Sequence, residues 1–125
     1  MARILIAEDE ESLCVLCARG LASDGHDVRT AGDGREALHM LSREQGRFDL
    51  LLTDIRMPIM DGIALALAAA RDFPNLTILL MTGYADQRER AHGLDTLIHD
   101  VISKPFTLAT LRSRVNAALA VKARG

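Results

Sequence analysis

Residues 50–63, LLLTDIRMPIMDGI, contain the clearest strand and turn signals of the chain. They open on an apolar run of the kind found in strands that are buried on both faces of a parallel sheet. The run ends in Thr53 and Asp54. The pairs Met57-Pro58 and Asp61-Gly62 then predict a turn and the start of a helix. This stretch therefore predicts a buried strand that ends in a carboxylate.

Four further strand-like runs lie along the chain, with helical segments between them. They are residues 4–7, 28–31, 76–82 and 99–103. Strands that alternate with helices predict an α/β fold in which helices cover both faces of one parallel sheet. The second run alternates in polarity and the fifth is short, which places both at the edges. We therefore expect a flavodoxin-like, doubly wound (βα)5 sheet with strand order 2-1-3-4-5.

The helical segments differ in how clearly they show an apolar face. In the first segment, the predicted face consists of Leu13, Leu16, Cys17 and Leu21. The last segment has the most regular stripe, with Leu108, Leu111, Val115 and Leu119. Residues 85–93 have almost no apolar face, which predicts a short and exposed helix.

The cysteine pair Cys14 and Cys17 has the CxxC spacing of some redox and zinc sites. It lies inside a helical pattern and follows Glu10 and Glu11, whereas a thioredoxin-type pair needs a helix N-terminus. No nearby Cys or His pair completes a zinc site. We therefore expect ordinary helix residues, with Cys17 facing the core and Cys14 nearer the surface.

Composition narrows the range of functions. The 125 residues fit one domain over residues 1–125, and 15 basic against 17 acidic side chains give a net charge of −2. This balance, without a basic run, argues against nucleic-acid binding, and the absence of Trp argues against a stacking platform. No apolar run reaches membrane-spanning length and no signal peptide is evident, so we expect a cytoplasmic protein with no membrane contact.

The predicted strand ends carry a coherent set of polar residues. In open α/β sheets the site forms at the carboxyl ends of the strands, where Glu8, Asp9, Asp54, Thr82 and Lys104 should meet. Clustered carboxylates suit Mg²⁺, which Asp9 would bind directly and Glu8 directly or through water. Asp54 would accept a phosphoryl group as nucleophile. The Lys104 ammonium and the Thr82 hydroxyl would bind its oxygens.

Several segments together resemble the receiver domain of two-component response regulators over nearly the full length. They are residues 3–10, 25–28, 31–38, 50–63, 82–85 and 103–106. The resemblance implies that a histidine kinase or a histidine phosphotransfer protein phosphorylates Asp54. It implies Mg²⁺ bound by Glu8, Asp9, Asp54 and the backbone carbonyl of Arg56. It also implies that Thr82 and Lys104 couple phosphorylation to a change of shape, and that Lys104-Pro105 is a cis peptide.

The resemblance also bears on output. It implies a signalling switch with self-phosphotransfer and autodephosphorylation only, not an enzyme with a separate substrate. Because the chain stops at Gly125, shortly after the predicted last helix, we expect no output domain. The residues of these motifs look most like those of single-domain regulators of the CpdR type. This implies signalling by protein contact, including delivery of substrates to an AAA+ protease, by a monomer or a phosphorylation-dependent dimer.

The chain departs from the family pattern at one position. The family often has an aromatic switch residue three positions before the lysine, where this chain has Val101. The inward swing of a Tyr or Phe therefore cannot occur here. Tyr84 is a candidate to take over part of that role or to shield the acyl phosphate, and Arg56 is a candidate to tune its lifetime.

Other functions fit the residues less well. An aspartate-nucleophile phosphatase requires an Asp-x-Asp motif after a strand, but in Asp54-Ile55-Arg56 an arginine occupies the position of the second aspartate. A flavodoxin-like electron carrier wants a phosphate loop after the first strand, where Glu8 and Asp9 would repel phosphate. An intermediate phosphoryl carrier in a relay and a phosphorylation-independent interaction module with a degenerate site both stay open.

Overall fold

The computed structural model describes residues 2–83, 93–94 and 96–124. Its elements follow one another as β1 (Arg3–Ala7), α1 (Glu11–Ala22), β2 (Asp27–Ala31), α2 (Gly34–Arg43), β3 (Leu50–Asp54), α3 (Gly62–Asp72), β4 (Thr77–Thr82), β5 (Asp100–Ser103) and α5 (Leu108–Arg124). The strands form one parallel sheet in the order β2-β1-β3-β4-β5. The predicted fold class and strand order are confirmed.

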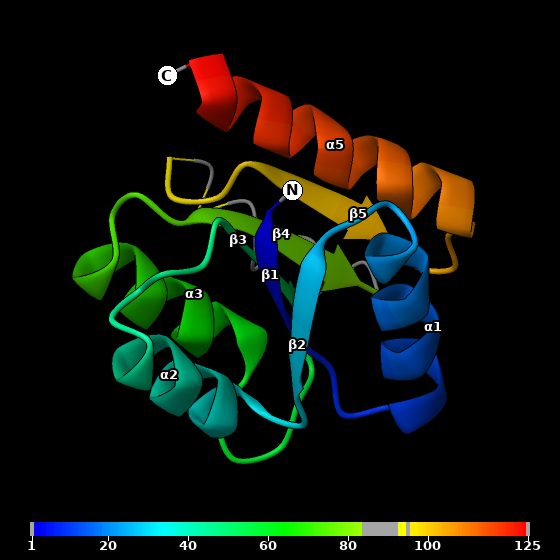
Figure 1. The fold of residues 1–125 in the computed structure, drawn as a ribbon. Helices are drawn as coiled ribbons and strands as arrows, with labels where there is room; N and C mark the ends of the chain where they lie inside the picture. Colours follow the sequence, from blue (N-terminus) through cyan, green and yellow to red (C-terminus); the bar gives the residue numbers. More distant parts are fainter. Residues whose placement is uncertain (1, 84–92, 95, 125) are drawn as a thin grey trace.

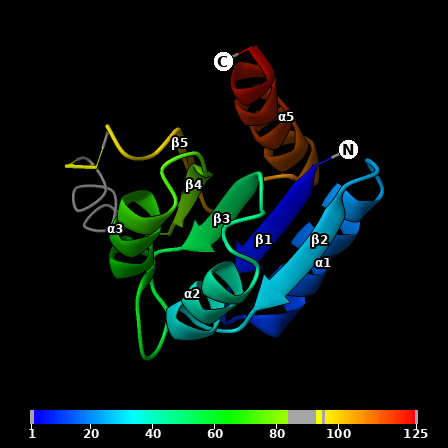
Figure 2. The ribbon, with the colours of Figure 1, turned by 60° about the vertical axis from the view of Figure 1, so that its left-hand side comes forward.

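Helices cover both faces of the sheet. Figures 1 and 2 show α2 and α3 together on one side, and α1 and α5 on the other. Alternate side chains of β1 enter the two cores, because successive residues of a strand point to opposite faces. Leu5 packs with α2 and α3, whereas Ile4 and Ile6 pack with α1 and α5. The sheet is thus the middle layer of three.

The burial of the strands agrees with their places in the sheet. All residues of β3 are buried, as its apolar run and central position require. In β2, at one edge, Arg29 and Thr30 are exposed, and β5, at the other edge, is only partly buried. Polar residues in an edge strand meet water at no desolvation cost, whereas in β3 they would need partners.

The first helix corrects one expectation. Cys17 and Leu21 are buried in α1 and Leu13 is partly buried, but Leu16 is 53% exposed. The stripe that meets the sheet runs through Leu13, Cys17 and Leu21, and Leu16 lies to one side of it. The orientation of the cysteines is confirmed: Cys17 is buried and Cys14 is half-buried. Burial raises the pKa of the Cys17 thiol to about 11.

Other expectations fall on residues that the structure does not describe. The expected fourth helix, residues 85–93, lies almost wholly outside the described residues, as does Tyr84. In β5, Val101 is partly buried and packs against the core beneath α2 and α3. Among the described residues, no helix has the length and apolar composition needed to cross a bilayer.

Candidate functional site

The register of the sheet brings the predicted site residues to one edge. Ala7 of β1 pairs with Thr53 of β3, so Glu8 and Asp54 follow as neighbours. Thr82 of β4 pairs with Ser103 of β5, which places Lys104 just beyond the end of the sheet. Four strands therefore deliver their last residues to the same place, because all strands of a parallel sheet end at one edge.

An acidic cluster forms at this edge. Glu8, Asp9 and Asp54 each offer a carboxylate oxygen, and these oxygens lie within 4.8 Å of one another. Glu8 and Asp54 are buried, with 2% and 6% of their surface exposed, whereas Asp9 is exposed. Buried carboxylates at this spacing repel one another unless a cation lies among them.

Lys104 supplies such a cation. Its Nζ atom donates to Glu8 Oε1 at 2.9 Å and to Asp54 Oδ2 at 2.8 Å. The peptide bond between Lys104 and Pro105 is cis, as expected. The backbone amide of Lys104 donates to the carbonyl of Thr82 at 2.6 Å, so the chain is held on β4 where the side chain turns inward.

The pKa values reflect this arrangement. Burial raises the pKa of Glu8 to about 7, although hydrogen bonds from Lys104 and from the amide of Glu10 act in the opposite direction. Burial by itself would lower the pKa of Lys104, but its hydrogen bonds to Asp54 and Glu8 raise it above its ordinary value. Lys104 therefore stays protonated at neutral pH, while the charge of Glu8 changes near neutral pH.

A cavity of about 590 Å³ opens over the cluster. Its polar side is formed by the acidic residues and Lys104, together with Arg56. Its apolar side is formed by Leu13, Pro105 and Phe106. The sequence interpretation missed this apolar wall: it treated Leu13 only as a core residue of α1, and nothing in its spacing shows that the helix start also borders the site.

Thr82 differs from the other predicted site residues in its place. It is buried at the end of β4, and Gly83, which follows it, is the residue that lines the cavity. A Cβ atom built on Gly83 would lie 4.0 Å from Lys104 Cδ, so the backbone runs close beside the lysine stem. The structure brings the acids, Lys104 and Arg56 around the cavity and puts Thr82 behind its wall.

The donor set fits Mg²⁺. Carboxylate oxygens are the hard ligands that this ion takes, and it usually binds through one or two carboxylates while it keeps several waters. The exposed Asp9 and the open cavity leave room for those waters. Within the described residues, these three carboxylates form the one group of possible metal ligands.

The connection after β3 shows a constraint that sequence reasoning assigned only to a turn. Gly62 donates its amide to the carbonyl of Ile55 at 2.7 Å. A Cβ atom on Gly62 would lie 1.9 Å from the carbonyl oxygen of Asp54, a clash that no backbone neighbour could accept. Glycine here lets α3 start directly against the strand end, which fixes the backbone of Asp54.

Comparison with known proteins gives consistent matches. Residues 4–116 match a family described as the response regulator receiver domain. The Mycobacterium leprae protein described as response regulator MprA is 36% identical over 117 residues, 94% of this chain and 50% of that protein. The alkaline phosphatase synthesis transcriptional regulatory protein PhoP of Bacillus subtilis is 33% identical over 117 residues, 94% of this chain and 48% of its own length. The chain thus spans about half the length of these curated relatives.

Solved structures match nearly the whole chain. A CheY-like response regulator receiver domain protein from Methanospirillum hungatei has a TM-score of 0.90 and 27% identity, and the match covers 99% of this chain and 98% of that one. The response regulator TrrA of Thermotoga maritima, solved in complex with Mg²⁺ and BeF, has a TM-score of 0.82 and 28% identity, with 94% and 99% of the two chains covered.

Proposed function

The chain belongs to the response regulator receiver domain family, and from this premise we propose that it is a phosphorylation-dependent signalling switch that accepts a phosphoryl group on Asp54. The phosphoryl donor would be a histidine kinase or a histidine phosphotransfer protein. An oxygen of the Asp54 carboxylate forms a bond to phosphorus while the bond from phosphorus to the donor breaks, and the donor keeps that electron pair.

The residues at the site divide this work among them. Glu8, Asp9, Asp54 and the backbone carbonyl of Arg56 would hold Mg²⁺, which when bound supplies positive charge to the phosphoryl oxygens. Lys104 lies 2.8 Å from Asp54 Oδ2 and is the cation nearest to the point where the phosphoryl group would attach. Its ammonium would neutralise one phosphoryl oxygen. The hydroxyl of Thr82 would bind another after a small movement of the β4 end.

The observation that carries this proposal is the environment of Asp54. Its carboxylate is buried, meets a lysine and lies within reach of two further acids at the mouth of an open cavity. A structural ion pair needs no third acid and no cavity, whereas an acceptor that works with a metal needs both.

The test is intact-mass analysis after incubation with acetyl phosphate, with and without Mg²⁺. We expect a Mg²⁺-dependent gain of one phosphoryl group that hydroxylamine removes, since that reagent cleaves acyl phosphates. Asp54→Ala should show no gain. As a matched control, Asp49→Ala removes a carboxylate at the opposite end of β3 and should leave the gain unchanged.

A protein that gains no phosphoryl group at any Mg²⁺ concentration would contradict the proposal and favour a phosphorylation-independent interaction module. Rapid return of the group to a phosphotransfer protein, with no stable change of shape, would instead favour an intermediate carrier in a relay. To distinguish a carrier from a switch, the phosphotransfer protein is added after the small phosphodonor has been removed, and the loss of the phosphoryl group from this chain is followed by intact mass.

The proposed output is a contact with another protein, made in the cytoplasm by a monomer or by a phosphorylation-dependent dimer. Delivery of substrates to an AAA+ protease, in the manner of the CpdR type, is the specific form that the sequence resemblance supports. A pull-down with the AAA+ protease, using unphosphorylated protein and phosphorylated protein in parallel, tests this form. Because Val101 replaces the usual aromatic switch, the change of shape on β5 would be smaller than an aromatic swing.

A further inference from the structure

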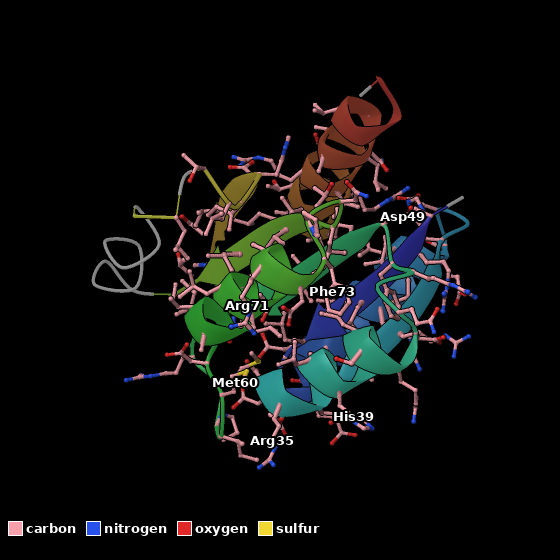
Figure 3. All side chains as sticks on the ribbon, turned by 90° about the vertical axis from the view of Figure 1, so that its left-hand side faces the viewer. Arg35, His39, Asp49, Met60, Arg71 and Phe73 are labelled. Atoms are coloured by element: carbon pink, nitrogen blue, oxygen red, sulfur yellow. The ribbon has the colours of Figure 1, made fainter. Side chains whose placement is uncertain are left out.

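The start of α2 presses on the loop that follows β3, residues 55–61, which we call the acceptor loop. The amide of Gly34 donates to the carbonyl of Met60 at 3.2 Å. A Cβ atom built on Gly34 would lie 2.3 Å from that same carbonyl oxygen, so glycine alone permits this approach. Figure 3 shows Met60 between α2 and α3. The proposed function makes no use of this contact.

The start of α3 repeats the arrangement on the other side of the acceptor loop. Gly62 is the first residue of α3, as Gly34 is of α2, and it presses on the carbonyl of Asp54. Each glycine follows an aspartate that caps its helix: Asp33 accepts from the amide of Glu36, and Asp61 from the amide of Ala64. Two Asp-Gly helix starts therefore hold the loop between them.

The acceptor loop is strained where these two helix starts hold it. Ile59 has a φ of 70° and is 75% exposed. A left-handed backbone is unfavourable for a β-branched residue. The amide of Met60 donates to the carbonyl of Pro58 at 2.7 Å, which closes a tight turn around Ile59. Such a conformation persists only where surrounding structure imposes it, and the contact of Gly34 with Met60 is placed to do so.

We propose that Gly34 is a positioning residue for the Mg²⁺ and phosphoryl site. Its contact with Met60 holds the acceptor loop, and the loop carries Arg56, which lines the cavity next to Asp54. Without that contact the loop relaxes at Ile59, and Arg56 leaves its place at the wall of the cavity that Asp54 also lines. This inference rests on the proposed function and adds a residue outside the cavity to its machinery.

The experiment compares Gly34→Ala with Gly32→Ala. Gly32 lies in the same connection between β2 and α2, but a Cβ atom there meets only Glu36 Oε2, at an ordinary 3.7 Å. The rate of phosphoryl uptake from acetyl phosphate is measured at saturating Mg²⁺. The dissociation constant of Mg²⁺ alone is measured from the ¹H–¹⁵N shifts of residues 54–56, and the unfolding midpoint is recorded for each variant.

We expect Gly34→Ala to slow uptake by about tenfold to a hundredfold, the usual effect of misplacing a reacting group by about 1 Å. It should also weaken Mg²⁺ binding and shift the amides of residues 54–56. Gly32→Ala should stay within about twofold of the wild type in both measurements. Uptake and Mg²⁺ binding by Gly34→Ala that match Gly32→Ala would overturn the inference.

A second variant keeps the test decisive if Gly34→Ala does not fold. Asp33→Ala adds no atom, but it removes the acceptor of the Glu36 amide and so loosens the start of α2 that contacts Met60. We expect slower uptake in Asp33→Ala and wild-type uptake in Asp33→Asn, which keeps a side-chain oxygen at this position. Equal uptake in these two variants would overturn the inference. A wild type that takes up no phosphoryl group would instead refute the proposed function. The comparison of Mg²⁺ dissociation constants would then still test whether Gly34 positions the site.

Discussion

Lys104 neutralises buried carboxylates that come from two different strands. Its ammonium lies 2.9 Å from Glu8 Oε1 and 2.8 Å from Asp54 Oδ2, and its side chain is 21% exposed. Removal of one partner of a largely buried ion pair is costly, because the remaining charges stay desolvated. Once the pH is high enough to ionise Glu8, whose pKa is raised to about 7, the remaining charges are both negative and also repel one another.

Lys104→Met should lower the unfolding free energy by about 2–3 kcal/mol without Mg²⁺, somewhat below the cost for a fully buried pair. It should tighten Mg²⁺ binding, because the ion no longer competes with the ammonium. Urea unfolding with and without Mg²⁺ measures both effects. Arg29→Met, which breaks an exposed pair with Asp27, is the control and should cost less than about 1 kcal/mol. A Lys104→Met protein as stable as the control would contradict this account.

The charge of Glu8 determines a pH dependence. Burial raises its pKa from 4.5 to about 7, so between these values the folded protein holds a proton that the unfolded chain has lost. The stability that this proton contributes is fully present below about pH 4.5 and is lost as the pH rises toward 7. The permanently neutral Glu8→Gln keeps no such dependence.

We therefore expect the wild type to lose up to about 3 kcal/mol relative to Glu8→Gln between pH 4.5 and pH 8, without Mg²⁺. Urea unfolding at several pH values measures the difference. Mg²⁺ binding to the wild type should tighten over the same range, because the ion displaces the proton of Glu8. A difference between the two proteins that stays constant with pH would show that Glu8 is ionised throughout.

At the scale of elements, the two Asp-Gly helix starts combine two tasks. The aspartate accepts a hydrogen bond from an amide of the first turn, and the glycine lets the helix begin against the backbone of the acceptor loop. α5 starts in a different way, with the hydroxyl of Thr107 as acceptor for the amide of Thr110 at 3.1 Å. Among the helices that the structure describes, only the two that border the acceptor loop have glycine at their first position.

Asp33→Ala should lower the unfolding free energy by about 1 kcal/mol, since it leaves the Glu36 amide without its acceptor at 2.8 Å. Asp33→Asn, which keeps a side-chain oxygen at this position, should lose much less. If the α2 start positions the acceptor loop, the alanine variant should also slow phosphoryl uptake while the asparagine variant does not. Chemical denaturation and intact-mass kinetics of the two variants provide the comparison.

At the scale of the whole molecule, the carboxyl edge of the sheet brings together the acidic cluster and Lys104, and the helices on the two faces of the sheet bury its apolar side chains. The ends of β1, β3, β4 and β5 surround the cavity, while the cores on either side hold the strands in register. Because Glu8 and Asp54 come from separate strands, they meet only in the folded state. Any cation that binds them therefore stabilises the fold.

Mg²⁺ at about ten times its dissociation constant should add about 1.4 kcal/mol of stability. For a domain of this size the thermal midpoint should rise by roughly 5 °C. Differential scanning fluorimetry with MgCl2, against NaCl of equal ionic strength, measures the rise. The same experiment on Asp9→Ala should show a much smaller rise, since this exposed carboxylate contributes to the cluster but not to the core. An equal rise in both proteins would place the ion elsewhere.

Much of this protein follows from its sequence alone. Apolar runs specify the strands, and apolar residues at helical spacing specify the helices between them. The difference between the uniform run at residues 50–53 and the alternating run at 28–31 indicates which strand is central and which lies at an edge. Because parallel strands end at one edge, the order of polar residues in the chain also predicts that Glu8, Asp54 and Lys104 meet. These features depend on local pattern and on a rule of topology.

Other features depend on how closely two elements approach, and no local pattern contains that distance. Leu16 has the same apolar character as Leu13, yet only the packing of α1 on the sheet leaves it exposed. That the ammonium of Lys104 bonds to both acids, and that Gly34 and Gly62 press on the carbonyls of Met60 and Asp54, follows from the tertiary structure. The sequence by itself determined that Glu8, Asp54 and Lys104 gather at the site; the packing of helices on the sheet decided which apolar residues border it and how firmly the acceptor loop is held there.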